Sequence, residues 1–310
     1  MDPFELFILG CGSATPTRRH SPTAQILRHR SHDYLIDCGE GTQLKLRHLS
    51  ISIQAIEHIF ISHLHGDHYF GLPGLLSTMQ MLGRKKLIHI YAHEELKELM
   101  MAQMRITGQY LRFPLEWHII PKNSEFQKIA DLPGLEVFTF PLKHSIATNG
   151  FLFREAEKER NIRPECIERY DIPYVRIRQI KQGADYTLAD GTVIANEELT
   201  LDPPPRRSYA FCSDTAFAEA TAGYVTGVDL LYHESTFLEG ERARARKTMH
   251  STARDAAEVA RSAGAGELLL GHFSARYRGL EAFAREAEEV FPAVRIAEEG
   301  TSYPIGPVQK

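Results

Sequence analysis

Long hydrophobic runs are absent from this chain of 310 residues, and its four cysteines are widely scattered. No stretch approaches the roughly 20 apolar residues that a membrane-spanning helix needs, and the first residues lack the basic start of a secretion signal. The cysteines form no CxxC pair, which argues against a disulfide framework and against a thiolate zinc site. We therefore expect a cytoplasmic protein with no membrane partner.

An excess of basic charge is also missing, because 36 Lys and Arg stand against 40 Asp and Glu, for a net charge of -4. This balance argues against a general nucleic-acid binder, whose affinity comes largely from a basic surface. An anionic substrate would have to be held by a local basic patch or by metal ions. The hydrophobic share of 43% is typical of a globular chain with one large domain or two small ones.

Short apolar runs that end in glycine or polar residues recur along the chain and predict buried strands. They cover residues 4–10, 34–41, 56–63, 86–92, 135–144, 208–214, 228–235 and 267–272. Helical spacing of apolar residues separates several of these runs, at 71–82, 94–106, 251–264 and 280–290. Strands and helices that alternate in this way predict an α/β fold.

The segment from 154 to 205 breaks this rhythm with scattered prolines and a predicted hairpin turn at 189–191. We interpret it as an arm inserted in the main domain and projecting from it. Residues 154–182 carry eight Lys or Arg against six Asp or Glu. The arm is either a solvated surface or a docking surface for an anionic polymer.

The stretch ISHLHGDHYFGLPG, residues 61–74, places four donors of the kind that bind metals within six positions: His63, His65, Asp67 and His68. Burying such groups without partners costs several kcal/mol, so this crowding indicates a bound ion. Three further donors, His144, Asp214 and His272, each follow a predicted strand. Imidazole and carboxylate without thiolate favour zinc over manganese or iron.

Seven donors exceed what one tetrahedral ion takes but match two ions that share a carboxylate. We assign His63, His65 and His144 to one ion, Asp67, His68 and His272 to the other, and Asp214 to both. The alternative is a single closed zinc site that only stabilises the fold.

The HxHxDH motif followed by GLPGL, together with SDT at 213–215, HEST at 233–236, HST at 250–252 and HFSARY at 272–277, resembles the metallo-β-lactamase superfamily. Within it, the chain resembles the ribonuclease Z family of tRNA 3′ processing endonucleases, nearly from end to end. The resemblance implies a four-layer αβ/βα sandwich over residues 1–310, two Zn2+ per subunit and a homodimer. It also implies that Asp67 is a general base and that the arm at 154–205 docks tRNA.

On this basis we expect a zinc-dependent endoribonuclease that removes the 3′ trailer from precursor tRNA, leaving a 3′-hydroxyl on the tRNA and a 5′-phosphate on the trailer. His250 is the candidate proton donor, or else only a helix cap. Glu234 either orients His250 or pairs with a cation. Ser274 and Arg276 are candidates for holding a phosphate.

Two other functions are compatible with the same residues. The first is a metal-dependent hydrolase of small phosphodiesters or related esters, which would keep the ions and change the substrate. The second is a noncatalytic RNA-binding or scaffold protein whose zinc is structural.

Overall fold

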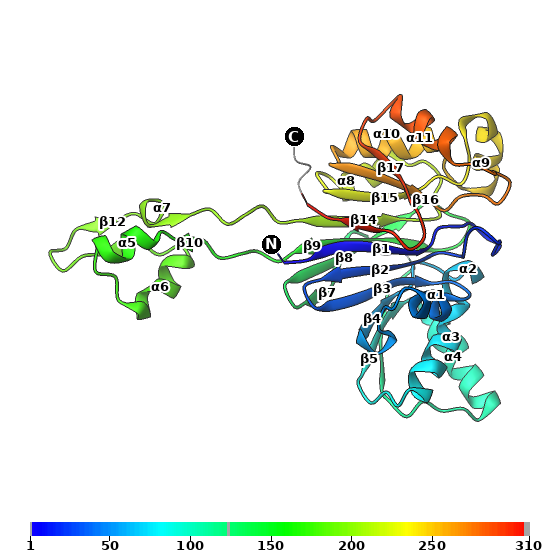
Figure 1. Cartoon of the computed structure of the whole chain (residues 1–310), viewed down its shortest axis with the longest axis horizontal. Coiled ribbons are helices and arrows are strands. Elements are labelled where there is room, and N and C mark those ends of the chain that lie inside the picture. The colour runs from blue at the N-terminus through cyan, green and yellow to red at the C-terminus, as the bar shows by residue number, and fades with distance from the viewer. Residues whose placement is uncertain (1, 123–124, 307–310) are drawn as a thin grey trace. The chain divides into compact units, whose positions relative to one another are not determined.

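The computed structural model describes residues 2–122 and 125–306, and Figure 1 traces the chain. By its internal contacts the chain divides into two compact units. The main unit is Met1–Arg154 with Arg207–Lys310, and the inserted unit is Glu155–Arg206. The inserted unit differs by one residue at each end from the segment that composition sets apart. That it projects and docks tRNA stays a prediction.

Two seven-stranded sheets form the centre of the main unit. The first sheet is antiparallel over its first four strands and parallel from β3 onward. Its order is β18 (Ser302–Pro304), β1 (Phe4–Gly10), β2 (Ala24–His29), β3 (His32–Cys38), β4 (Ile56–Phe60), β5 (Ile88–Ala92) and β6 (Leu115–Ile119).

The second sheet has parallel strands on one side and antiparallel strands on the other. Its order is β17 (Val294–Ile296), β16 (Glu267–Gly271), β15 (Leu230–Glu234), β14 (Ser208–Cys212), β9 (Thr148–Glu155), β8 (Leu135–Leu142) and β7 (Gln127–Leu132).

Helices cover the outer face of each sheet, as Figure 1 shows. On the first sheet lie α1 (Thr42–His48), α3 (Gly71–Met81) and α4 (Glu94–Thr107), and on the second lie α8 (Glu219–Tyr224), α10 (Ala253–Ala263) and α11 (Glu281–Glu288). The helix α3 buries Leu72, Leu75, Leu76 and Met79, whose spacing places them on one stripe. The predicted four-layer α/β sandwich is therefore confirmed.

Aromatic side chains fill the space between the two sheets. Phe60 of the first sheet meets Phe151 and Phe153 of the second, with ring centroids 5.6 and 5.2 Å apart. Because these sheets are covered on both faces, their central strands have nearly continuous apolar sequences. Runs of this kind predicted β1, β3, β4, β5, β8, β14, β15 and β16, whereas β2, β6, β7, β9, β17 and β18 were missed.

The inserted unit has its own short elements and a small core. They are β10 (Asn161–Ile162), α5 (Pro164–Arg169), α6 (Tyr174–Lys181), β11 (Tyr186–Thr187), β12 (Val193–Ile194), α7 (Asn196–Leu199) and β13 (Thr200–Leu201). Cys166, Ile172, Ile180 and Leu199 are packed together. Strands β11 and β12 pair across the predicted hairpin turn, where Gly191 has a positive φ of 87°.

Among the described residues, no helix has both the length and the apolar character needed to cross a bilayer. The four cysteines are all buried and unpaired, as their scatter predicts.

Candidate metal centre

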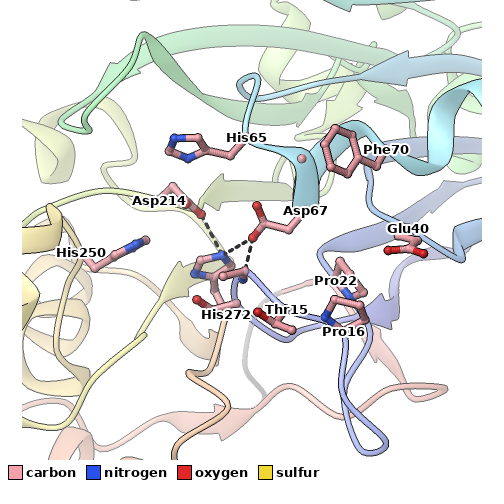
Figure 2. A pocket seen from close by; sticks show the side chains of 13 residues that line it. Thr15, Pro16, Pro22, Glu40, His65, Asp67, Phe70, Asp214, His250 and His272 are labelled. Atoms are coloured by element: carbon pink, nitrogen blue, oxygen red, sulfur yellow. Dashed lines mark hydrogen bonds and ion pairs between the residues drawn. The ribbon is translucent and has the colours of Figure 1, made fainter.

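The seven predicted donors lie in the segments that follow four strands. His63 and His65 follow β4, and the short helix α2 (Gly66–Tyr69) carries Asp67 and His68. The other three follow strands of the second sheet, namely β8, β14 and β16. The facing sheets place these strand ends together, and Figure 2 shows the resulting pocket. We call the seven side chains the seven-donor cluster.

The first group in this cluster contains His63, His65 and His144. The Nε2 atom of His63 lies 3.1 Å from Nδ1 of His65, which lies 3.2 Å from Nε2 of His144. Two nitrogens bound to one tetrahedral zinc lie about 3.4 Å apart. The spacing of these three atoms therefore fits one ion.

The second group contains Asp67, His68 and His272. The Oδ2 atom of Asp67 lies 3.5 Å from Nε2 of His68 and 3.6 Å from Nε2 of His272. Both of these Nε2 atoms are buried without a hydrogen-bond partner. A buried polar atom without a partner is costly, so the two nitrogens fit a cation that would accept their lone pairs.

Asp214 lies between the two groups. Its Oδ2 is 3.5 Å from Nε2 of His63 and of His144, and its Oδ1 is 3.1 and 3.0 Å from Nε2 of His68 and His272. One oxygen thus faces each group, as a shared carboxylate requires. The structure brings the seven side chains together in the grouping that we assigned, and their role as ligands stays a prediction.

The backbone is unusual where the seven-donor cluster meets the second sheet. Asp214 and His272 have positive φ values of 59° and 58°, in the left-handed region that residues other than glycine seldom adopt. Such conformations tend to occur at functional sites, where surrounding structure holds them against a cost of about 1–3 kcal/mol each.

Three of the imidazole rings are fixed by a hydrogen bond from their second nitrogen. His68 Nδ1 donates to Oδ2 of Asp37 over 2.6 Å. His144 Nδ1 donates to the carbonyl of Met249 over 2.9 Å. His272 Nδ1 faces the hydroxyl of Thr236 at 3.0 Å. Such contacts set the tautomer of each ring and leave Nε2 as the lone-pair donor.

Asp37 was missed by our sequence reasoning. Its carboxylate also accepts hydrogen bonds from the backbone N–H and the hydroxyl of Ser62, at 2.8 and 2.9 Å. The Ser62 oxygen then faces Nδ1 of His63 at 3.0 Å. One buried carboxylate therefore orients a ring in each group. A charged residue inside the apolar run 34–41 was the signal that could have identified it.

The electrostatics of the cluster suit a bound cation. Burial opposes the charge of Asp214, yet the surrounding histidines lower its pKa well below the usual range. Burial, together with His68, lowers the pKa of His63 to about 3. Burial likewise opposes protonation of His272, but Asp214 and Asp67 raise its pKa to about 10. Without an ion, protons must therefore balance the buried carboxylates.

A cavity of about 520 Å³ opens beside the second group. It is lined by Ser13, Ala14, Thr15, Pro16, Pro22, Glu40, His65, Gly66, Asp67, Phe70, Asp214, His250 and His272. The backbone N–H of Ala14 donates to Oδ2 of Asp67 over 2.7 Å, which joins the loop after β1 to the cluster.

His250 borders this cavity and is fixed by Glu234. Its Nδ1 lies 2.8 Å from Oε1 of Glu234, whose other oxygen accepts from the hydroxyl of Thr236. Burial disfavours the charged ring, but the Glu234 carboxylate raises the pKa of His250 overall. A ring held through Nδ1 has Nε2 free to donate a proton. His250 is not the N-cap of α10, because Thr252 occupies that position.

Ser274 and Arg276 do not line the cavity. The guanidinium of Arg276 contacts the Ser274 hydroxyl at 3.1 Å and the Glu241 carboxylate at 3.2 Å, and lies over the ring of Phe237. The arginine is already paired, so a phosphate would have to compete with Glu241. Its proposed contact with substrate stays a prediction.

Known proteins resemble this chain in sequence over nearly its full length. Residues 4–154 match the family model described as anti-Pycsar protein Apyc1. A ribonuclease Z of Phocaeicola vulgatus is 44% identical over 300 residues, which are 96% of this chain and 96% of that protein. The chain belongs to the ribonuclease Z family. The family resemblance expected from the motifs is thereby confirmed.

Two solved structures share the fold. Human tRNase Z, short form, has a TM-score of 0.70 and 24% identity, over 96% of this chain and 98% of that one. The metallo-β-lactamase fold protein YhfI of Bacillus subtilis also has a TM-score of 0.70, with 17% identity over 98% and 100%. The fold is thus that of the metallo-β-lactamases. Because the chain belongs to the ribonuclease Z family, has this fold and carries the clustered donors, it is metal-dependent.

Proposed function

We propose that this chain is an endoribonuclease that removes the 3′ trailer from precursor tRNA, leaving a 3′-hydroxyl on the tRNA and a 5′-phosphate on the trailer. The observation that carries the proposal is the seven-donor cluster beside an open cavity, in a chain 44% identical to a ribonuclease Z over 96% of its length. We further propose that it works in the cytoplasm as a homodimer.

The seven-donor cluster would hold two Zn2+ per subunit, with three donors for each and Asp214 shared. Two such ions would supply positive charge that activates water and offsets the charge of the phosphate under attack. The set has no thiolate, which suits a catalytic rather than a closed structural zinc site.

Asp67 would orient the attacking water. It lines the cavity, and the N–H of Ala14 fixes one of its oxygens at 2.7 Å. Burial raises the pKa of Asp67, but His68 and His272 outweigh this effect and lower it below the usual range. The carboxylate is therefore ionised at neutral pH, ready to accept a hydrogen bond from water.

His250 would protonate the leaving 3′ oxygen of the tRNA. Water adds to phosphorus, the P–O bond to the 3′ oxygen breaks, and that oxygen takes a proton from Nε2 of the imidazolium. Glu234 holds the ring through Nδ1 and favours its protonated form.

The inserted unit supplies a candidate docking surface for the body of the tRNA. Its helix α6 presents Arg176 and Arg178 to solvent, beside Tyr174, whose side chain is 87% exposed. Basic and aromatic side chains on one short helix suit contact with a phosphate backbone and its bases.

The central experiment incubates the purified protein with a 3′-extended tRNA transcript, with and without a chelator, and maps both product ends. We expect metal-dependent cleavage and a 3′-hydroxyl on the tRNA. A 2′-deoxy sugar at the cleavage site should still be cut, because water is the nucleophile. A 2′,3′-cyclic phosphate on the product would contradict the mechanism.

A second experiment tests the docking surface with the R176A/R178A double variant. Each lost phosphate contact should weaken precursor binding and lower the slope of log affinity against log salt by about 1. Hydrolysis of bis(p-nitrophenyl) phosphate should not change. The matched control is K85A/R105A, which removes two exposed cations of the main unit. Equal losses on both substrates would remove the docking role.

A further inference from the structure

A second cluster of metal-binding side chains lies at the edge of the first sheet. His89 of β5 pairs in register with Glu116 of β6, and His118 follows two residues later on the same strand. Side chains two residues apart on a strand lie on one face, so all three are on the same side. We call His89, Glu116 and His118 the edge triad.

The distances within the edge triad match those of the seven-donor cluster. His89 Nδ1 lies 3.1 Å from Nε2 of His118 and 3.5 Å from Oε2 of Glu116. His118 Nε2 lies 3.8 Å from Oε1 of Glu116. The corresponding distances among His63, His65, His144 and Asp214 are 3.1–3.5 Å. Ligands of one tetrahedral zinc lie about 3.4 Å apart, so both sets fit an ion.

The surroundings hold the rings of the edge triad in place. His58 of β4 stacks on His89 with ring centroids 4.5 Å apart, and Tyr91 stacks on His118 at 4.3 Å. These stacked rings restrict rotation and keep the two nitrogens within 3.8 Å of a Glu116 oxygen, so little side-chain freedom would be lost on binding. Pre-oriented ligands lower the entropic cost of taking up an ion.

We propose that the edge triad binds one Zn2+, separately from the seven-donor cluster. Two imidazoles and one carboxylate are ligands that zinc accepts, and three protein ligands leave one position for water. The side chains are 25%, 53% and 32% exposed for His89, Glu116 and His118, so an ion can enter from solvent. The bound ion links the terminal strand β6 to β5. The proposal is independent of the substrate that the main site cuts.

Calorimetric titration tests this site on protein whose seven-donor cluster has first been loaded with zinc. Wild type should take up one further Zn2+ per chain, and zinc should raise its melting temperature. H118A and E116Q should each lower the affinity for that further ion by more than about tenfold. Loss of a residue that only hydrogen-bonds a ligand already lowers metal affinity by at least this much, and loss of a ligand itself should lower it further. The control H48A removes an exposed histidine at the end of α1 and should bind as wild type does.

Circular dichroism would verify that each variant is folded, and E116Q keeps the shape of the side chain it replaces. The absence of further uptake by wild type would overturn the proposal. Uptake by H118A and E116Q with the wild-type affinity would overturn it as well.

Discussion

The seven-donor cluster and the edge triad have similar spacings but different surroundings. In the first, His63, His68, His272 and Asp214 are buried, and hydrogen bonds to residues such as Asp37 and Thr236 fix the rings. In the second, the three side chains are a quarter to a half exposed, and ring stacking provides the order. Spacing makes metal binding feasible in both clusters, and we expect burial and the orienting contacts to make the seven-donor cluster the tighter site.

The physical reason lies in the state without metal. Nε2 of His68 and of His272 are buried, make no hydrogen bond of good geometry and face the carboxylates of Asp67 and Asp214, so burying this set without an ion is costly. An ion relieves that cost in the seven-donor cluster. In the edge triad water can already solvate the ligands, so binding gains less. We therefore expect a chelator to remove zinc from the edge triad first.

The largest effect should come from Asp214→Ala. Both groups of the seven-donor cluster lose their shared carboxylate, so tRNA cleavage should fall by more than the roughly 10⁴-fold that loss of a general acid can cause. Metal analysis should show reduced zinc per chain. The control Asp131→Ala removes an exposed carboxylate on β7 and should keep both metal and activity. Full zinc content with full activity in D214A would contradict the role of Asp214 as the carboxylate shared by both groups.

His250→Ala should lower the rate of tRNA cleavage by about 10²–10⁴-fold while zinc content stays unchanged. The residue borders the cavity and is assigned to neither group of the seven-donor cluster. Single-turnover kinetics would measure the rate. Bis(p-nitrophenyl) phosphate has a leaving group that needs no proton, so its hydrolysis should be nearly unaffected. An equal loss on both substrates would contradict the role as proton donor.

Asp37→Asn should weaken the contacts that orient His63 and His68, so the rings of the seven-donor cluster lose orienting hydrogen bonds that the edge triad also lacks. Zinc affinity should fall by about 10–100-fold, the usual effect of removing a ligand's partner. Competition with a fluorescent chelator would measure it. Asp33→Asn is the matched control, since Asp33 is also a buried carboxylate of β3 but pairs with Arg28. Equal losses of affinity in both variants would remove the orienting role.

Glu234→Gln should have the smallest effect, a shift in the pH dependence of cleavage. Burial lowers the pKa of His250, and the Glu234 carboxylate more than offsets this. Without that charge the pKa falls, so the protonated ring is lost at a lower pH. The descending alkaline limb of the rate profile should therefore move to lower pH. An unchanged limb, measured at saturating zinc, would show that another group controls it.

Much of the fold could be predicted from the sequence because central strands covered on both faces are nearly continuous apolar runs. The strands β2, β6 and β9 were missed since their sequences mix polar and apolar residues. The edge triad was not recognised for a different reason. His89 and His118 are 29 residues apart, and only strand pairing places them together.

The sequence alone determined the kind of chemistry, because the HxHxDH stretch places four donors within one loop and helix start. It also placed three more donors after strands. Only the tertiary structure decided which nitrogen of each ring faces inward and that the two oxygens of Asp214 face different groups. Those facts depend on contacts between residues far apart in the chain, such as His68 with Asp214, which form only when the two sheets pack.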